Sequence, residues 1–238
     1  MKVGVVLFPG SNCEQDVLEA VRALGGDAEL LWHGDPTVGD SDAVVLPGGF
    51  SHGDYLRPGA IARFSPVMSA VHEMARSGGP VVGICNGFQV LTEAGLLPGA
   101  LQKNRGLKFL CTTVGLAVTS TRSVLTSLCE PGQVLRIPIN HFEGSYTCSP
   151  ATLAELQQGE RVLLRYIANP NGSIDDVAAI CSEGGNVVGL MPHPERACDT
   201  RLGSEDGAVL LRSLLAAASA FGSRRPERPL LATSPRPG

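Results

Sequence analysis

The side chain whose surroundings most clearly suggest chemistry is the thiol of Cys85. Residues 83–87 read GICNG, after an apolar run at 81–84 and before a helical pattern at 86–94. This is the G-x-nucleophile-x-G arrangement of a nucleophile elbow, a strand-to-helix turn too sharp for side chains at its flanking positions. The N-terminus of the following helix favours a thiolate there. Cysteines in apolar strands are often packing alone, so a nucleophile also needs a proton carrier beside it.

Among the five histidines, His193 has the surroundings expected of that carrier. It stands in Met191-Pro192-His193-Pro194-Glu195, directly after an expected strand. A residue before proline is biased towards extended backbone, and residues two apart in an extended chain face the same way. We therefore expect His193 and Glu195 to converge, with the carboxylate holding the imidazole tautomer for work on Cys85. The alternative, a surface turn with an incidental ion pair, is disfavoured by the elbow.

A third motif is a glycine-rich loop, Leu46-Pro47-Gly48-Gly49-Phe50, at the end of an expected strand. Backbone N–H groups left free at Gly48 and Gly49, together with that of Asn86, could stabilise an oxyanion. Pro-Gly-Gly alone is a weak turn signal. Its position one strand–helix unit before the elbow supports the interpretation.

These motifs must be positioned by a sheet. Continuous apolar runs predict strands buried on both faces, and helical spacing separates several of them. The expected strands of this first part are 3–8, 28–32, 43–46 and 81–84, and the expected helices are 14–24, 66–76 and 86–94. Their alternation predicts a doubly wound α/β sheet. The later part predicts strands 110–118, 133–139 and 161–168 without long helices between them, a hairpin of 177–181 with 187–191, and a last helix from about Ser204 to Phe221.

The bulk composition excludes several classes of protein. The 238 residues are 43% hydrophobic and 18% charged with a formal net charge of −4, which argues against a nucleic-acid partner. Seven widely spaced cysteines without a C-x-x-C indicate neither a disulfide framework nor a zinc site. The apolar start is too short for a signal peptide or a membrane span. We expect a cytoplasmic protein with reduced thiols, and a disordered Pro/Arg-rich tail at 222–238.

The three motifs, in this order, resemble the class I (triad) glutamine amidotransferases over nearly the whole chain up to the tail. The resemblance implies one such domain over residues 1–221, with a flavodoxin-like doubly wound mixed sheet and helices on both faces. It also implies that Cys85 attacks the side-chain amide of glutamine, with His193 as the proton carrier and Glu195 as its orienting partner. Gly48, Gly49 and Asn86 would then serve the oxyanion, and Gln89 would lie near the bound glutamine.

Two further stretches, FPGSNCEQD at 8–16 and GGFSHGDYLRPGAIA at 48–62, are similar to one branch of that family, the glutaminase subunits of a purine-biosynthetic ligase. The resemblance implies that ammonia passes to a separate synthetase subunit that uses ATP and Mg²⁺, with a small accessory subunit as another partner. This chain has no P-loop, so nothing in it suggests that it binds ATP itself. We expect no cofactor and no metal in this chain. Three alternatives stay open: an amidotransferase subunit with another acceptor, a different flavodoxin-like cysteine protein, and a catalytically silent regulatory subunit.

One segment departs from the family pattern. Residues 139–146 read INHFEGSY, where the resemblance predicts I-A-H-G-E-G-R-Y. We expect a structural or partner-facing role for His141 and Glu143. His52 stands where a tyrosine is expected, and the triad needs neither His52 nor Asp54. Cys13 lacks flanking glycines, so we expect a structural thiol there.

Overall fold

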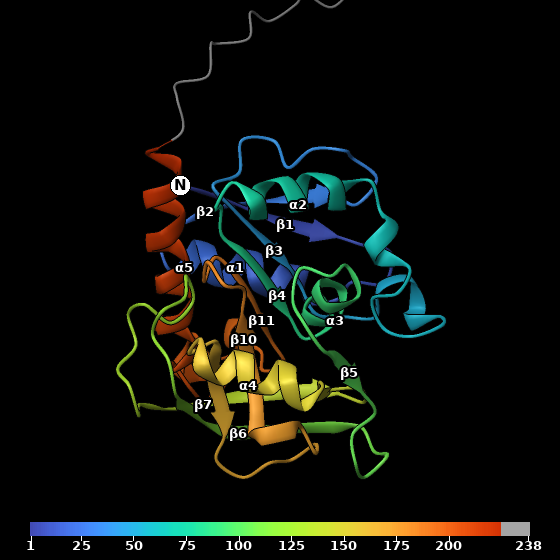
Figure 1. The fold of residues 1–238 in the computed structure, drawn as a ribbon. Helices are drawn as coiled ribbons and strands as arrows, with labels where there is room; N and C mark the ends of the chain where they lie inside the picture. Colours follow the sequence, from blue (N-terminus) through green and yellow to red (C-terminus); the bar gives the residue numbers. More distant parts are fainter. Residues whose placement is uncertain (225–238) are drawn as a thin grey trace, which may run out of the picture.

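A nine-stranded mixed sheet runs through the protein, whose computed structural model describes residues 1–224 (Figure 1). Its strands lie in the order β2-β1-β3-β4-β11-β10-β9-β6-β7. The first five are mutually parallel, and every pairing from β11 to β7 is antiparallel. In that order their bounds are Asp27–Trp32, Lys2–Leu7, Ala43–Leu46, Val81–Ile84, Val187–Leu190, Val177–Cys181, Val162–Tyr166, Leu110–Val118 and Val134–His141.

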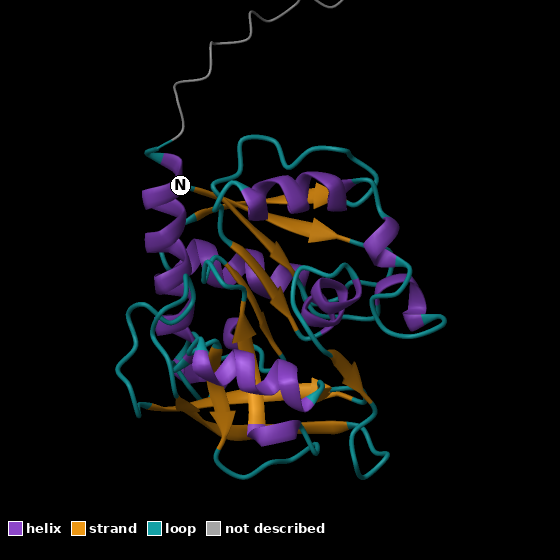
Figure 2. Ribbon diagram, in the orientation of Figure 1, coloured by secondary structure: helices purple, strands orange, loops and turns teal. Residues whose placement is uncertain are grey.

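Helices lie on both faces of this sheet (Figures 1 and 2). On one face α1 (Glu14–Ala23) and α5 (Gly207–Gly222) contact each other, and on the other α2 (Val67–Arg76) and α3 (Asn86–Glu93) pack against β4. Each presents an apolar stripe at helical spacing, as in α2, which buries Val67, Met68, Val71 and Met74. The predicted doubly wound mixed sheet with helices on both faces is confirmed.

The central strands explain why the sequence predicts this half of the sheet well. Every residue of β3, β4 and β11 is buried, which matches their continuous apolar runs. The predicted strands 43–46, 81–84, 110–118 and 177–181 have the observed bounds, and the others agree within two residues at each end.

We predicted no long helix between strands 133–139 and 161–168, and the short helix α4 (Pro150–Gln158) that lies there was missed. Ser149 caps it by accepting the backbone N–H of Thr152 at 3.0 Å, and Pro150 occupies its first turn. A serine followed by proline is a helix-start signal that was available in the sequence. A separate two-stranded sheet of β5 (Ala100–Gln102) and β8 (Ser145–Thr147) was also missed, since three residues are too few for a periodicity.

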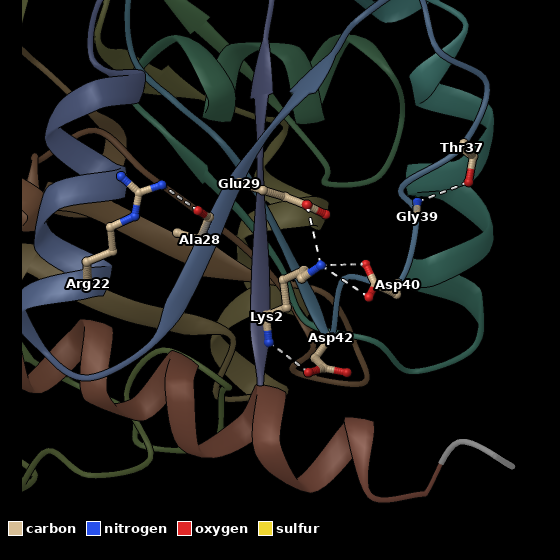
Figure 3. Close-up of polar contacts among 8 residues, drawn as sticks. All are labelled: Lys2, Arg22, Ala28, Glu29, Thr37, Gly39, Asp40 and Asp42. Carbon is tan, nitrogen blue, oxygen red and sulfur yellow. Dashed lines mark hydrogen bonds and ion pairs between the residues drawn. The ribbon is translucent and has the colours of Figure 1, made fainter. Parts of the chain in front are cut away.

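Polar contacts tie the start of β1 to its neighbours (Figure 3). The backbone N–H of Lys2 donates to Asp42 at 2.8 Å, and its ammonium contacts Asp40 at 2.9 Å and Glu29 at 3.4 Å. Such partly exposed ion pairs contribute only about 0–1 kcal/mol. The buried apolar side chains of β1 therefore stabilise this edge more than its charges do.

All seven cysteines are free thiols in the structure. Within residues 1–224, no helix has both the length and the apolar character needed to cross a membrane. The disordered tail was predicted to begin at Gly222, but Gly222 is the last residue of α5. The rest of that prediction, from residue 225 on, lies outside the described residues.

Candidate active site

The turn between β4 and α3 has the geometry of a nucleophile elbow. Cys85 has φ 52° and ψ −105°, a conformation that is strained for any residue with a side chain. A Cβ on Gly83 would lie 2.5 Å from the carbonyl oxygen of Gly87, and a Cβ on Gly87 would lie 1.9 Å from that of Leu46. Both glycines are therefore required by close backbone approach, as the sequence pattern predicts.

The pairing of β4 with β11 brings the elbow to the segment that carries the histidine. Ile84 is in register with Leu190, and the backbone N–H of Cys85 donates to the Leu190 carbonyl at 2.7 Å. Both strands end at this point, so His193, three residues after Leu190, lies at the same edge of the sheet as the elbow. In open α/β sheets the carboxyl ends of the parallel strands are where ligands bind.

His193 and Glu195 form a buried pair. The Nδ1 of His193 lies 2.6 Å from Oε1 of Glu195, and the two residues are 1% and 3% exposed. The predicted reason for this convergence is wrong, because the chain is not extended through Glu195. Pro194–Arg196 forms a 3-10 turn, and that turn brings the carboxylate back to the ring.

The surroundings of His193 favour its charged form. Burial opposes the charge, but the Glu195 carboxylate and the sulfur of Cys85 outweigh it and raise the pKa of His193 well above its usual value. The hydrogen bond to Glu195 leaves Nε2, which has no hydrogen-bond partner among the described residues, for proton transfer. Cys85 is 5% exposed, and its Sγ lies 3.7 Å from the Asn140 carbonyl oxygen.

The predicted oxyanion donors have unused backbone N–H groups. Gly49 lines the same pocket as Cys85, and neither its N–H nor the backbone N–H of Asn86 donates a hydrogen bond to another described residue. Gly49 has φ +140°, and a Cβ there would lie 2.7 Å from the backbone nitrogen of Asn12. The N–H of Gly48 likewise donates to no described residue, and a Cβ on Gly48 would lie 2.7 Å from Cε1 of His193. Its lack of a side chain lets the imidazole approach.

The side chains of Asn86 and Gln89 organise the loops around the elbow. Asn86 accepts the backbone N–H of Ser51 at 3.0 Å and donates through Nδ2 to Asp54 at 3.1 Å and to Gln89 at 2.8 Å. Gln89 donates to the carbonyl oxygen of Glu143 at 2.5 Å. Helix α3 thus holds both the 3-10 segment η1 (Ser51–Asp54) and the loop after β7, a role for Asn86 that sequence reasoning missed.

A pocket of about 290 Å³ opens over Cys85 and is also lined by Gln89, His141 and Glu143. We expected a structural or partner-facing role for these last two residues, yet both line the cavity of the candidate nucleophile. His141 is 4% exposed, and burial lowers its pKa to about 4, so that its ring is neutral at pH 7. A histidine and a glutamate two positions apart at the end of a strand, at 141 and 143, are the signal that could have located them.

Cys13 lies beside the imidazole–carboxylate pair. Its sulfur and one ligand atom each from His193 and Glu195 lie within 4.8 Å of one another, the one such group of possible metal ligands within residues 1–224. The guanidinium of Arg196, which also bonds Asp16 at 2.9 Å, donates to the Cys13 sulfur at 3.1 Å. A positive charge so close to the sulfur opposes the entry of a cation.

A thiol on an elbow, a buried imidazole–carboxylate pair and unused backbone N–H groups can together cleave an amide through an acyl-enzyme. Residues 1–205 match the model of the CobB/CobQ-like glutamine amidotransferase domain, and the chain belongs to that family.

Similar proteins from other organisms carry the name of one particular subunit within this family. The phosphoribosylformylglycinamidine synthase subunit PurQ of Rubrobacter xylanophilus is 59% identical over 218 residues, which cover 92% of this chain and 99% of the relative. The subunit of the same name from Trichormus variabilis is 56% identical, over 90% of this chain and 97% of its own. A chain in the structure of PurLQS from Thermotoga maritima superposes on this chain with a TM-score of 0.84 at 40% sequence identity. The match covers 90% of this chain and 97% of that chain.

Proposed function

We propose that this chain is the glutaminase subunit of a phosphoribosylformylglycinamidine synthase. It hydrolyses glutamine to glutamate and ammonia and passes the ammonia to a synthetase subunit. That subunit uses the ammonia in the ATP-dependent conversion of formylglycinamide ribonucleotide to formylglycinamidine ribonucleotide, a step of purine biosynthesis. The observation that carries the proposal is the similarity to PurQ subunits over nearly their full length, 59% identical over 99% of one of them.

The first half of the reaction forms a thioester. The Cys85 thiolate attacks the side-chain amide carbon of glutamine, and the backbone N–H groups of Gly49 and Asn86 stabilise the oxyanion of the tetrahedral intermediate. The imidazolium of His193 gives its Nε2 proton to the departing nitrogen as the C–N bond breaks. The products of this half are ammonia and the glutamyl thioester.

The second half restores the thiol. His193, now neutral at Nε2, accepts a proton from a water molecule that attacks the thioester carbon, and the C–S bond breaks to release glutamate. Throughout, the Glu195 carboxylate accepts the Nδ1–H bond at 2.6 Å, which holds the ring orientation and stabilises the imidazolium whenever it forms.

The proposed partners are the synthetase subunit and a small accessory subunit. ATP and Mg²⁺ belong to the synthetase in this proposal, because the sequence of this chain has no P-loop. The absence of a disulfide among the seven cysteines is consistent with work in the reducing cytoplasm.

The test is reconstitution of the complex from the subunits encoded in the same genome. We expect this chain to co-purify with the synthetase and accessory subunits and to give the synthetase glutamine-dependent product formation. A complex that uses ammonium salts but not glutamine would refute the assignment. The matched control is the same complex assembled with the Cys85→Ala variant, which should use ammonium salts alone.

A further inference from the structure

The pocket over Cys85 holds polar groups that the proposed chemistry does not use. Asp54, Glu143 and His141 all line it. His141 is 4% exposed, and neither of its ring nitrogens has a hydrogen-bond partner among the described residues. A buried imidazole without a partner indicates that a polar ligand completes the site. The volume of about 290 Å³ is at the small end for ligand pockets, which suits a molecule of amino-acid size.

The two carboxylates of the pocket lack a cationic partner. Neither Asp54 nor Glu143 forms an ion pair with any residue in the described part of the chain. The nearest arginine in sequence, Arg57, is bound in a bidentate pair to Glu93 at 2.5 and 2.6 Å. Lys103, on the pocket wall, lies over the ring of Phe142 at 6.0 Å from its centroid.

Burial and the neighbouring charge make this arrangement costly without a cation. Asp54 is half-buried, and burial, opposed by its hydrogen bond from Asn86 and reinforced by the charge of Glu143, raises the pKa of Asp54 to about 6. Two carboxylates that repel each other in a partly buried site are stabilised together when a cation binds between them. The pocket therefore has a site for a positive group close to the elbow.

The carboxylates are held in position relative to the nucleophile. The Nδ2 of Asn86, the residue after Cys85, donates to Asp54 at 3.1 Å. One turn later on the same helix, Gln89 donates to the backbone carbonyl of Glu143 at 2.5 Å. Both loops are thus tied to the helix that begins at the elbow, so the anionic subsite is preorganised before substrate binds.

We infer that Asp54 and Glu143 form the subsite that binds the α-ammonium group of glutamine. This inference rests on the proposed function, because it places the side-chain amide of the same molecule at Cys85. In glutamine two methylene groups separate the amide carbon from the carbon that carries the ammonium. The pair of carboxylates would select substrates with a free amine and disfavour those in which the amine is missing or acylated.

The test compares glutamine with 4-carbamoylbutanoate, which has the same amide and carboxylate but no amine, as substrates of the assembled complex. We expect the wild-type complex to prefer glutamine strongly in kcat/KM. Asp54→Asn and Glu143→Gln, which keep size and hydrogen-bonding shape, should each reduce that preference about 10- to 100-fold, mainly by raising the KM for glutamine. Asp54→Glu should restore part of the preference.

Lys103→Gln is the matched control, since it removes an opposite charge from the same pocket. It should leave the ratio between the two substrates close to the wild-type value, whatever it does to each rate. If Asp54→Asn and Glu143→Gln lower kcat/KM for both substrates by the same factor, the inference is wrong. Two variants on separate loops keep the test valid if one of them fails to fold.

Alkylation separates a failure of this inference from a failure of the proposed function. Iodoacetamide has no amine, so it should label Cys85 at similar rates in the wild type, Asp54→Asn and Glu143→Gln. Normal labelling with unchanged substrate preference would refute the ammonium subsite alone. Absence of labelling at Cys85 in the wild type, with no glutaminase activity in the complex, would refute the proposed function.

Discussion

The backbone N–H of Cys85 donates a 2.7 Å hydrogen bond to the carbonyl oxygen of Leu190. This bond lies where β4 and β11 end side by side, so it joins the elbow to the segment that leads to His193. Two motifs far apart in the sequence therefore meet because their strands are adjacent and parallel. A change that alters this pairing should disturb the reaction without touching a reacting atom.

Replacement of the nucleophile gives the most direct prediction. Cys85→Ala should abolish ammonia release from glutamine, because no other thiol stands on the elbow. A glutamine-analogue electrophile should label the wild-type chain at Cys85, measured by peptide mass spectrometry, and should leave the variant unlabelled. Glutamine-dependent synthesis by a complex containing the Ala variant would show that the nucleophile is another residue.

Glu195→Gln should lower kcat by about 10²- to 10⁴-fold, as expected when the group that orients a catalytic histidine loses its charge. The Glu195 carboxylate raises the pKa of His193, so its removal lowers that pKa and the imidazolium is lost at lower pH. The basic limb of the pH profile of kcat should move to lower pH. Glu205→Gln, at an exposed carboxylate, is the control and should leave both unchanged.

The elbow glycines give a prediction about stability. Gly87→Ala places a Cβ 1.9 Å from the Leu46 carbonyl oxygen, so backbone must shift, and the free energy of unfolding should fall by about 3 kcal/mol. Gly106→Ala is the matched control, since a Cβ there meets no atom within 4 Å. Urea titration of the two variants measures the difference. Equal stabilities would contradict the close backbone contact.

The pH dependence of substrate binding tests the anionic subsite. Asp54 has a raised pKa of about 6, so it is a carboxylate above that pH and increasingly neutral below it. The groups around it are Asn86 from α3, Glu143 from the loop after β7, and His141 and Lys103 on the pocket wall. The KM for glutamine should rise as the pH falls below about 6. Asp54→Asn should flatten this rise, and a rise of the same size in that variant would assign it elsewhere.

Activity should also depend on the partner. Ammonia released without an acceptor is wasted, so we expect the isolated subunit to be a weak glutaminase whose kcat/KM increases when the synthetase is added. Ammonia release followed in a coupled assay measures this directly. A lone subunit as active as the complex would contradict the expectation.

The parts of the site that obey local rules can be predicted from residue types and their spacing. Gly83 and Gly87 are visible because a tight elbow tolerates no side chain at either position, and the buried central strands are visible as continuous apolar runs. Ser149 and Pro150 carried an equally local signal for α4 that was not used. These features depend on neighbours in the chain, so residue types and spacing suffice to predict them.

The other residues that face Cys85 are placed by packing between segments far apart in the chain. His141 reaches the pocket from the end of β7, and Glu143 reaches it from the following loop, whose backbone accepts a hydrogen bond from Gln89 of α3. Asn86 joins that region to Asp54 through its side chain. Glu195 meets His193 through a 3-10 turn and not through extended backbone. Such contacts arise from packing between distant segments, which leaves no periodicity or spacing in the sequence from which they could be predicted.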